Sequence, residues 1–172
     1  FKKIKESWTL RADGSQVYRH MKALTLYTHT AMNRTYGESF ITYDPRYQTL
    51  EIHESYTRQK DGNIVKTPDN AFVEVLPAAA ANAPAFNALR EMVVVHTGLE
   101  LGATVYLDYS ITSKPGYLPE INVCRQLEQS SPVKEYEISI TVPQGQRLEY
   151  ALDNLKSKPL VTEKEGMKQV SW

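Results

Sequence analysis

Cys124 is the only cysteine of the chain and so its only thiol nucleophile. A catalytic thiol needs a histidine within hydrogen-bond reach and a third polar group that orients the imidazole. All four histidines, at positions 20, 29, 53 and 96, precede Cys124. This excludes, within the chain, the order Cys, His, Asp that one large class of thiol enzymes uses. Nothing around Cys124 indicates the start of a helix, the setting that activates many catalytic thiols. We therefore expect Cys124 to be a small apolar residue on a strand.

The histidines do not have the spacing of metal ligands. His20 and His29 are nine residues apart, which in one strand places them on opposite faces. His53 and Glu54 are adjacent and also point apart, and neither His-x-His nor His-Glu-x-x-His occurs. We expect solvated strand histidines, with no metal centre and no cofactor. Oxygen ligands are plentiful, which leaves a surface calcium ion open as an alternative.

Two further groups of residues could carry function. Glu135 and Glu137 share one face of a predicted strand about 7 Å apart, within the separation of glycosidase carboxylates, although any solvated strand face has the same pattern. Four aromatic residues near predicted loops and strand ends are candidate ligand contacts for a sugar or peptide, the alternative being core and rim positions of a sandwich. They are Trp8, Tyr43, Tyr47 and Tyr117. We assign no catalytic residue.

The elements that would position these residues are strands. Val105, Leu107, Tyr109 and Ile111 alternate with polar residues, a period that places them on one face of a strand but all around a helix. Asp-Gly pairs at positions 13–14 and 61–62 predict tight hairpin turns. Strand-like runs recur at residues 4–10, 17–28, 39–43, 49–58, 64–66, 71–76, 90–96, 104–112, 120–127, 134–142, 147–152 and 166–172.

Many short strands with regular turns predict an all-β fold, a large antiparallel β-sandwich. The alanine-rich stretch 77–89, bounded by prolines, allows at most one short helix near residues 78–89. No internal repeat or second boundary appears, so residues 1–172 are predicted to form a single domain. Its last strand ends on Trp172, and we expect the chain to be a fragment of a longer multidomain protein.

Composition excludes several classes of function. Lys plus Arg is 20 and Asp plus Glu is 20, so the formal charge is 20 − 20 = 0, which argues against a nucleic-acid partner. Hydrophobic residues make up 41% of the chain, too many for a disordered segment. No apolar run approaches the roughly 20 residues of a transmembrane helix, and the chain does not open with a signal peptide. A single cysteine leaves the compartment undetermined.

Several phrases, in order, resemble a known family. They include residues 43–50 (YDPRYQTL), residues 56–58 followed by Asp61-Gly62, residues 67–72 (TPDNAF), residues 99–102 (LELG), residues 131–135 (SPVKE), residues 142–145 (VPQG) and Trp172. The resemblance is to the uncharacterised domain-of-unknown-function family found N-terminal to transglutaminase-like (cysteine-protease-like) domains in exported proteins of Gram-negative bacteria. It extends over nearly the whole chain.

The resemblance implies a large sandwich similar to the N-terminal domain of zinc aminopeptidases, without their metal site, in a periplasmic or extracellular protein. It also implies a transglutaminase-like domain in the same polypeptide as the partner. It carries over no catalytic residue. We therefore expect a non-catalytic module that supports or positions that domain, not an enzyme in itself. The alternative is a carbohydrate- or peptidoglycan-binding module that uses the exposed aromatic residues.

Overall fold

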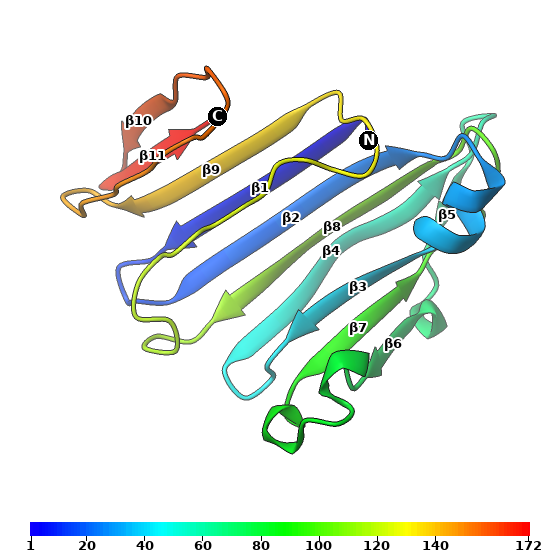
Figure 1. Cartoon of the computed structure of the whole chain (residues 1–172), viewed down its shortest axis with the longest axis horizontal. Helices are drawn as coiled ribbons and strands as arrows, with labels where there is room; N and C mark the ends of the chain where they lie inside the picture. The colour runs from blue at the N-terminus through cyan, green and yellow to red at the C-terminus, as the bar shows by residue number, and fades with distance from the viewer.

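The computed structural model describes residues 1–172, which form eleven strands in two sheets (Figure 1). The large sheet has the order β10 (Leu160–Lys164), β11 (Met167–Ser171), β9 (Tyr136–Pro143), β1 (Lys3–Leu10), β2 (Gln16–Thr25), β8 (Thr104–Ser113), β4 (Gln48–Arg58) and β5 (Ile64–Lys66). The small sheet has the order β3 (Glu38–Tyr43), β7 (Arg90–Val95) and β6 (Phe72–Val75). The chain ends beside β11, at the opposite end of the molecule from the small sheet.

The predicted all-β class is confirmed, with differences in detail. All the pairs are antiparallel except β1 with β9, which run parallel with Ile4 opposite Tyr136. The stretch near residues 78–89 contains two 3-10 turns instead of one short helix, and Pro84 opens the second of them. Two further helical turns, Ala31–Thr35 and Asp69–Ala71, were not predicted.

Two predicted strands are wrong and one strand was missed. Residues 120–127 and 147–152 lie in extended connections that join no sheet. Their apolar residues, such as Ile121 and Val123, alternate for too short a distance to hold a strand in register. Strand β10 was not predicted, because all five of its residues are exposed and it lacks the alternation of a half-buried strand.

The core lies between one face of the large sheet and the small sheet. Leu107 and Ile111 of β8 contact Ile41 of β3 and Val94 of β7. Leu107 and Val94 are 1% and 0% exposed. The alternation of strand β8 causes this arrangement, because every second side chain points to the same face. We call the face of the large sheet that carries Leu107 and Ile111 the inner face.

The hairpin turns form where the Asp-Gly pairs predict them. Asp13 accepts hydrogen bonds from the backbone N–H of Ser15 at 2.9 Å and from its hydroxyl, which tightens the turn between β1 and β2. Gly14 and Gly62 have φ angles of 83° and 93°, in the left-handed region that glycine adopts without steric cost. Both hairpins pair neighbouring strands in the predicted way.

Residues 114–135, between β8 and β9, form a long connection that runs beside β1 (Figure 1). It contacts the inner face of β1 and β2 through Arg125, whose guanidinium lies 5.5 Å from the ring centroids of both Trp8 and Tyr18. The inner face is therefore covered by two pieces, the small sheet and this connection. None of the helical turns approaches the length and apolarity that a membrane-crossing helix requires.

The contact between the sheets makes a stability prediction. Leu107→Ala removes a buried side chain and should lower the free energy of unfolding by about 3 kcal/mol. Leu160→Ala, at a position that is 65% exposed, is the matched control and should change it by less than about 0.5 kcal/mol. Urea unfolding measures both, and equal losses would contradict this core.

Candidate functional site

Glu6 is a carboxylate buried on the inner face of the large sheet. On β1 it lies between Ile4 and Trp8 in the inward phase, and it is 3% exposed. Tyr18 and Tyr136 donate hydroxyl hydrogen bonds to its two oxygens at 2.5 and 2.7 Å. Strands β1, β2 and β9 are thus joined by one carboxylate.

Arg125 completes this cluster from the long connection. Its guanidinium donates to Glu6 at 2.8 Å and to the Tyr18 hydroxyl at 2.9 Å. His20 Nδ1 lies 3.5 Å from the same Glu6 oxygen. We call Glu6, Tyr18, His20, Arg125 and Tyr136 the Glu6 cluster. Its members use one another as partners, so the carboxylate has no oxygen left unbound.

The partners decide the protonation state of Glu6. Burial by itself raises the pKa of the carboxyl group, because the charged form loses its hydration. Hydrogen bonds from His20, Tyr18 and Tyr136, together with the charge of Arg125, outweigh burial and lower the pKa to about 2. Glu6 is therefore an ionised anchor at neutral pH, and its pKa is far from the value that a general acid needs.

A second buried cluster connects the two sheets. Lys22 of β2 donates to the Ser39 hydroxyl at 2.8 Å, and Ser39 lies 2.7 Å from Nε2 of His96. A serine this close to an imidazole is the geometry of an activated nucleophile. Burial lowers the pKa of His96 to about 4, and the charge of Lys22 adds to the effect, so the ring is neutral and able to accept a proton.

The burial of Ser39 and His96 argues against nucleophilic catalysis by this pair. Ser39 is 6% exposed and His96 is 4% exposed, both between the sheets, while a nucleophile has to meet its substrate. His96 Nδ1 also has no hydrogen-bond partner, so no third group orients the ring. The cluster instead pairs the Ser39 hydroxyl with Lys22 and with Nε2 of His96, polar groups that the packing of the sheets has buried.

The candidate thiol and the histidines do not come together. Cys124 is exposed in the long connection, so its prediction as an apolar strand residue is wrong. His53 reaches the Ser110 hydroxyl through Nε2 at 2.9 Å, and His29 lies beyond the end of β2. No three His, Cys, Asp or Glu side chains lie close enough together to hold a metal ion.

Glu135 and Glu137 lie at the outer face, where lysines pair with them. Lys3 contacts both carboxylates, and Lys5 lies 2.6 Å from Glu137. These contacts lower the pKa of Glu137, the hydrogen bond from Lys5 contributing most. Each carboxylate therefore has an adjacent cation, and the lowered pKa of Glu137 makes it unsuited to be the protonated acid that glycosidic cleavage requires.

The four candidate aromatic residues occupy three separate places. Trp8 lies beneath Arg125 and packs on Tyr18 with ring centroids 5.1 Å apart. Tyr43 donates its hydroxyl to Glu74, and burial together with this bond raises its pKa to about 12. Tyr47 and Tyr117 do meet, stacked 4.7 Å apart with only 7° between their planes.

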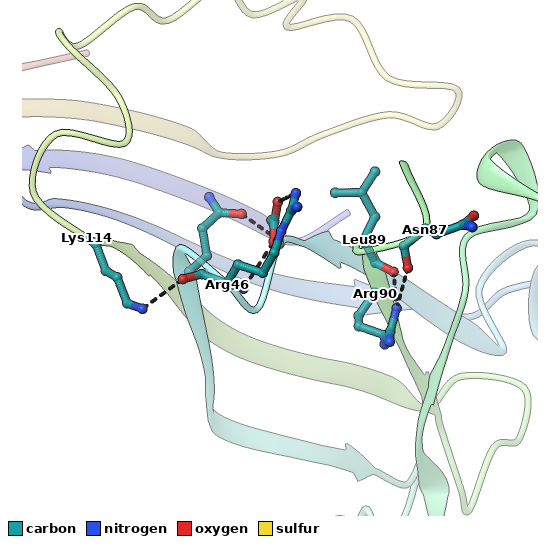
Figure 2. A network of polar contacts seen from close by, with 7 residues as sticks. Arg46, Asn87, Leu89, Arg90 and Lys114 are labelled. Atoms are coloured by element: carbon teal, nitrogen blue, oxygen red, sulfur yellow. Dashed lines mark hydrogen bonds and ion pairs between the residues drawn. The ribbon is translucent and has the colours of Figure 1, made fainter. Parts of the chain in front are cut away.

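The turn that carries Tyr47 is held by charges. Arg46 pairs with Asp44 through two hydrogen bonds of 3.0 and 2.7 Å, and Lys114 donates to the Arg46 carbonyl at 2.7 Å (Figure 2). The Arg46 guanidinium also lies 5.3 Å from the Tyr47 ring centroid. The stacked tyrosines therefore form a patch between the start of β4 and the end of β8, supported by these contacts.

Glu6 and Lys22 were not among the predicted site residues. The sequence does indicate that both side chains point inward, because each alternates in step with apolar residues of its strand. Glu6 alternates in step with the apolar Ile4 and Trp8, and Lys22 in step with Tyr18 and Leu24. A charged residue at an inward position of a strand predicts a buried partner or a cavity.

Glu6→Gln keeps the side-chain shape and removes the charge. Since the folded pKa of about 2 lies below the unfolded value of 4.5, the charge should stabilise the fold by about 3 kcal/mol above pH 4.5. This stabilisation should disappear as the pH falls toward 2. Urea unfolding at pH 7 and at pH 3 measures it.

The control is Glu128→Gln on the exposed part of the same connection, which should behave as the parent protein at both pH values. A loss for Glu6→Gln that is the same at pH 3 as at pH 7 would contradict an ionised Glu6.

The chain is similar to known sequences and structures. Residues 12–172 match the model of a domain-of-unknown-function family with a solved structure, DUF3857. A crystal structure from Parabacteroides distasonis ATCC 8503, described as a "putative protease", shares 62% sequence identity with a TM-score of 0.97. The match covers 99% of this chain and 34% of that one, so the chain spans about a third of this relative's length. None of the curated proteins matches. The family model extends over nearly all of the chain, which therefore belongs to the DUF3857 family.

Proposed function

We propose that the chain is a non-catalytic β-sandwich module that supports or positions an enzymatic domain in the same polypeptide, and that this domain is transglutaminase-like, in the broad class of cysteine proteases. We further propose that the protein acts in the periplasm or outside the cell, as the sequence resemblance implies. The observation that carries the proposal is the length of the relative described as a putative protease. Nearly all of this chain matches it, but the match covers only 34% of that relative.

The polar clusters of the chain support a structural role. The Glu6 cluster satisfies a buried carboxylate, and the cluster of Lys22, Ser39 and His96 fills the space between the sheets. The one thiol, Cys124, is exposed in a connection without a hydrogen-bonded imidazole. Each group that could do chemistry is either inaccessible or without the partner that would activate it.

The outer face of the small sheet supports a neighbouring domain as partner. Phe40, Val93 and Val73 form one cross-strand row over β3, β7 and β6, and Phe40 and Val73 are 58% and 44% exposed. Val75, on the same face, is 38% exposed. Soluble domains seldom leave such a row open to water unless something covers it. We assign the enzymatic domain as the occupant, since the relative is about three times the length of the match.

The proposal predicts a clear division of activity. The chain alone should hydrolyse neither peptides nor γ-glutamyl amides, and in the complete polypeptide Cys124→Ala and Ser39→Ala should leave kcat unchanged. Phe40→Ser in that polypeptide should weaken the contact between domains, and Leu160→Ser is the exposed control. Limited proteolysis between the domains should then become faster for Phe40→Ser alone. Turnover by the isolated chain that Cys124→Ala or Ser39→Ala abolishes would contradict the proposal.

A carbohydrate- or peptidoglycan-binding module is the second candidate, and the stacked Tyr47 and Tyr117 favour it. Tyr47 is 42% exposed, and the part of its ring that the Arg46 guanidinium does not cover is open to a sugar. Tyr117→Ala should abolish binding to insoluble peptidoglycan in this case, while Trp8→Ala, beneath Arg125, should not. Binding that neither substitution changes would exclude the tyrosine patch as its site.

A further inference from the structure

A cavity of about 320 Å³ opens beside the Glu6 cluster on the inner face. It lies where the small sheet and the long connection, the two segments that cover the inner face, meet. Residues of the large sheet, of the turn before the small sheet and of the connection all line it: Glu6, Lys22, Tyr36, Gln126 and Gln129. The volume is at the lower end of the range of small-molecule sites. The cavity therefore has room for a ligand of one small ring.

Charge in the cavity is unbalanced. Glu6 is the only carboxylate of the lining, and Arg125, Tyr18 and Tyr136 already bind it. Lys22 forms one hydrogen bond, to Ser39, and no carboxylate of the chain lies within 4 Å of its ammonium group. An ammonium group carries three donors, so two of them have no partner within the chain.

Because Lys22 is largely buried, a positive charge without a counter-ion at this position destabilises the fold. Burial alone lowers its pKa to about 8, which leaves the amine charged at neutral pH without a counter-ion. Glu6 is the one acidic side chain of the same lining, and it is already paired with Arg125. The other titratable side chains of the lining are His20 and four tyrosines, Tyr18, Tyr36, Tyr109 and Tyr136, and none of them carries a carboxylate. A bound anion would supply the missing charge.

The remaining lining suits an organic molecule. Gln126 and Gln129 form no side-chain hydrogen bond within the chain, so their amides are free to donate. Phe1, Ile4 and Tyr36 provide an apolar wall, and the rings of Phe1 and Tyr36 meet edge to face at 5.5 Å. Arg125 is paired with Glu6, which leaves Lys22 as the one cation of the lining without a counter-ion and favours a monoanion over a dianion such as sulfate.

We propose that this cavity binds a small organic carboxylate, whose anionic group pairs with Lys22 and accepts hydrogen bonds from Gln126 and Gln129, while its apolar part packs against Ile4 and Tyr36. The site is independent of the enzymatic domain, because every residue of it belongs to this chain.

Benzoate is a suitable probe, with benzamide as its neutral isostere and inorganic sulfate as the dianion. NMR titration of the chain at neutral pH, up to about 10 mM ligand, should detect benzoate at least about 10-fold tighter than either comparison. Lys22→Met should reduce benzoate affinity by at least about 10-fold, and Lys66→Met, at an exposed position of β5, should not. Lys22→Met should also keep or raise the midpoint of unfolding, since it removes an uncompensated buried cation.

Three results would overturn the proposal: equal binding of benzoate and benzamide, benzoate binding that Lys22→Met leaves intact, or no binding of benzoate at all. If Lys22→Met does not fold, Gln126→Ala on the exposed connection takes its place. It should weaken benzoate binding about 3-fold or more, the loss of one hydrogen bond, and unchanged affinity would overturn the proposal equally. Binding of sulfate in preference to benzoate would contradict the choice of a monoanion.

Discussion

A carboxylate buried between two layers of a protein has to be bound on every side, and Glu6 imposes that constraint on this fold. Leaving it without partners would cost several kcal/mol. The chain meets the requirement with Tyr18 from β2, Tyr136 from β9 and Arg125 from the long connection. Arg125 and Tyr136 lie 119 and 130 positions from Glu6 in the sequence. The bonds of Glu6 therefore also connect β1 with its parallel partner β9 and with residues 114–135 on the inner face. One side chain organises the half of the large sheet that the small sheet does not cover.

The divided cover of the inner face explains the other properties of the molecule. Where the small sheet packs, the contact is apolar and centred on Leu107 and Val94, and the polar groups trapped there, Ser39 and His96, bind each other. Where the connection packs, the contact is polar and centred on Glu6. At the boundary between these two regions lie a cavity and the ammonium group of Lys22, which donates to Ser39 but has no counter-ion within the chain. A supporting role for the fold and a ligand site at this boundary are compatible, because the first depends on the outer surface of the small sheet and the second on the interior.

Much of this fold could be predicted from the sequence, because its signals are local. The alternation of Val105 to Ile111 and the Asp-Gly turns gave the central strands and both hairpins. The parallel pairing of β1 with β9 could not be predicted, since it joins residues about 130 positions apart and no short turn connects the two strands. Residues 120–127 resemble a strand locally but cover the inner face, where Arg125 contacts Glu6, Tyr18 and Trp8. Tyr47 and Tyr117 were both predicted as candidate residues, although their stacking was not. The burial of Glu6 and Lys22 could have been predicted only by combining their charge with their position on the inward face of a strand.

The central claim is that Glu6 and Arg125 join the long connection to the sheet, and a double-mutant cycle tests it most directly. Free energies of unfolding are compared at pH 7 for the parent chain, Glu6→Gln, Arg125→Met and the double variant. Direct contact at 2.8 Å predicts a coupling energy of about 1–3 kcal/mol, with the double variant losing much less than the sum of the single losses. Single losses that add to within about 0.5 kcal/mol would show that the two residues do not depend on each other, and would contradict the account.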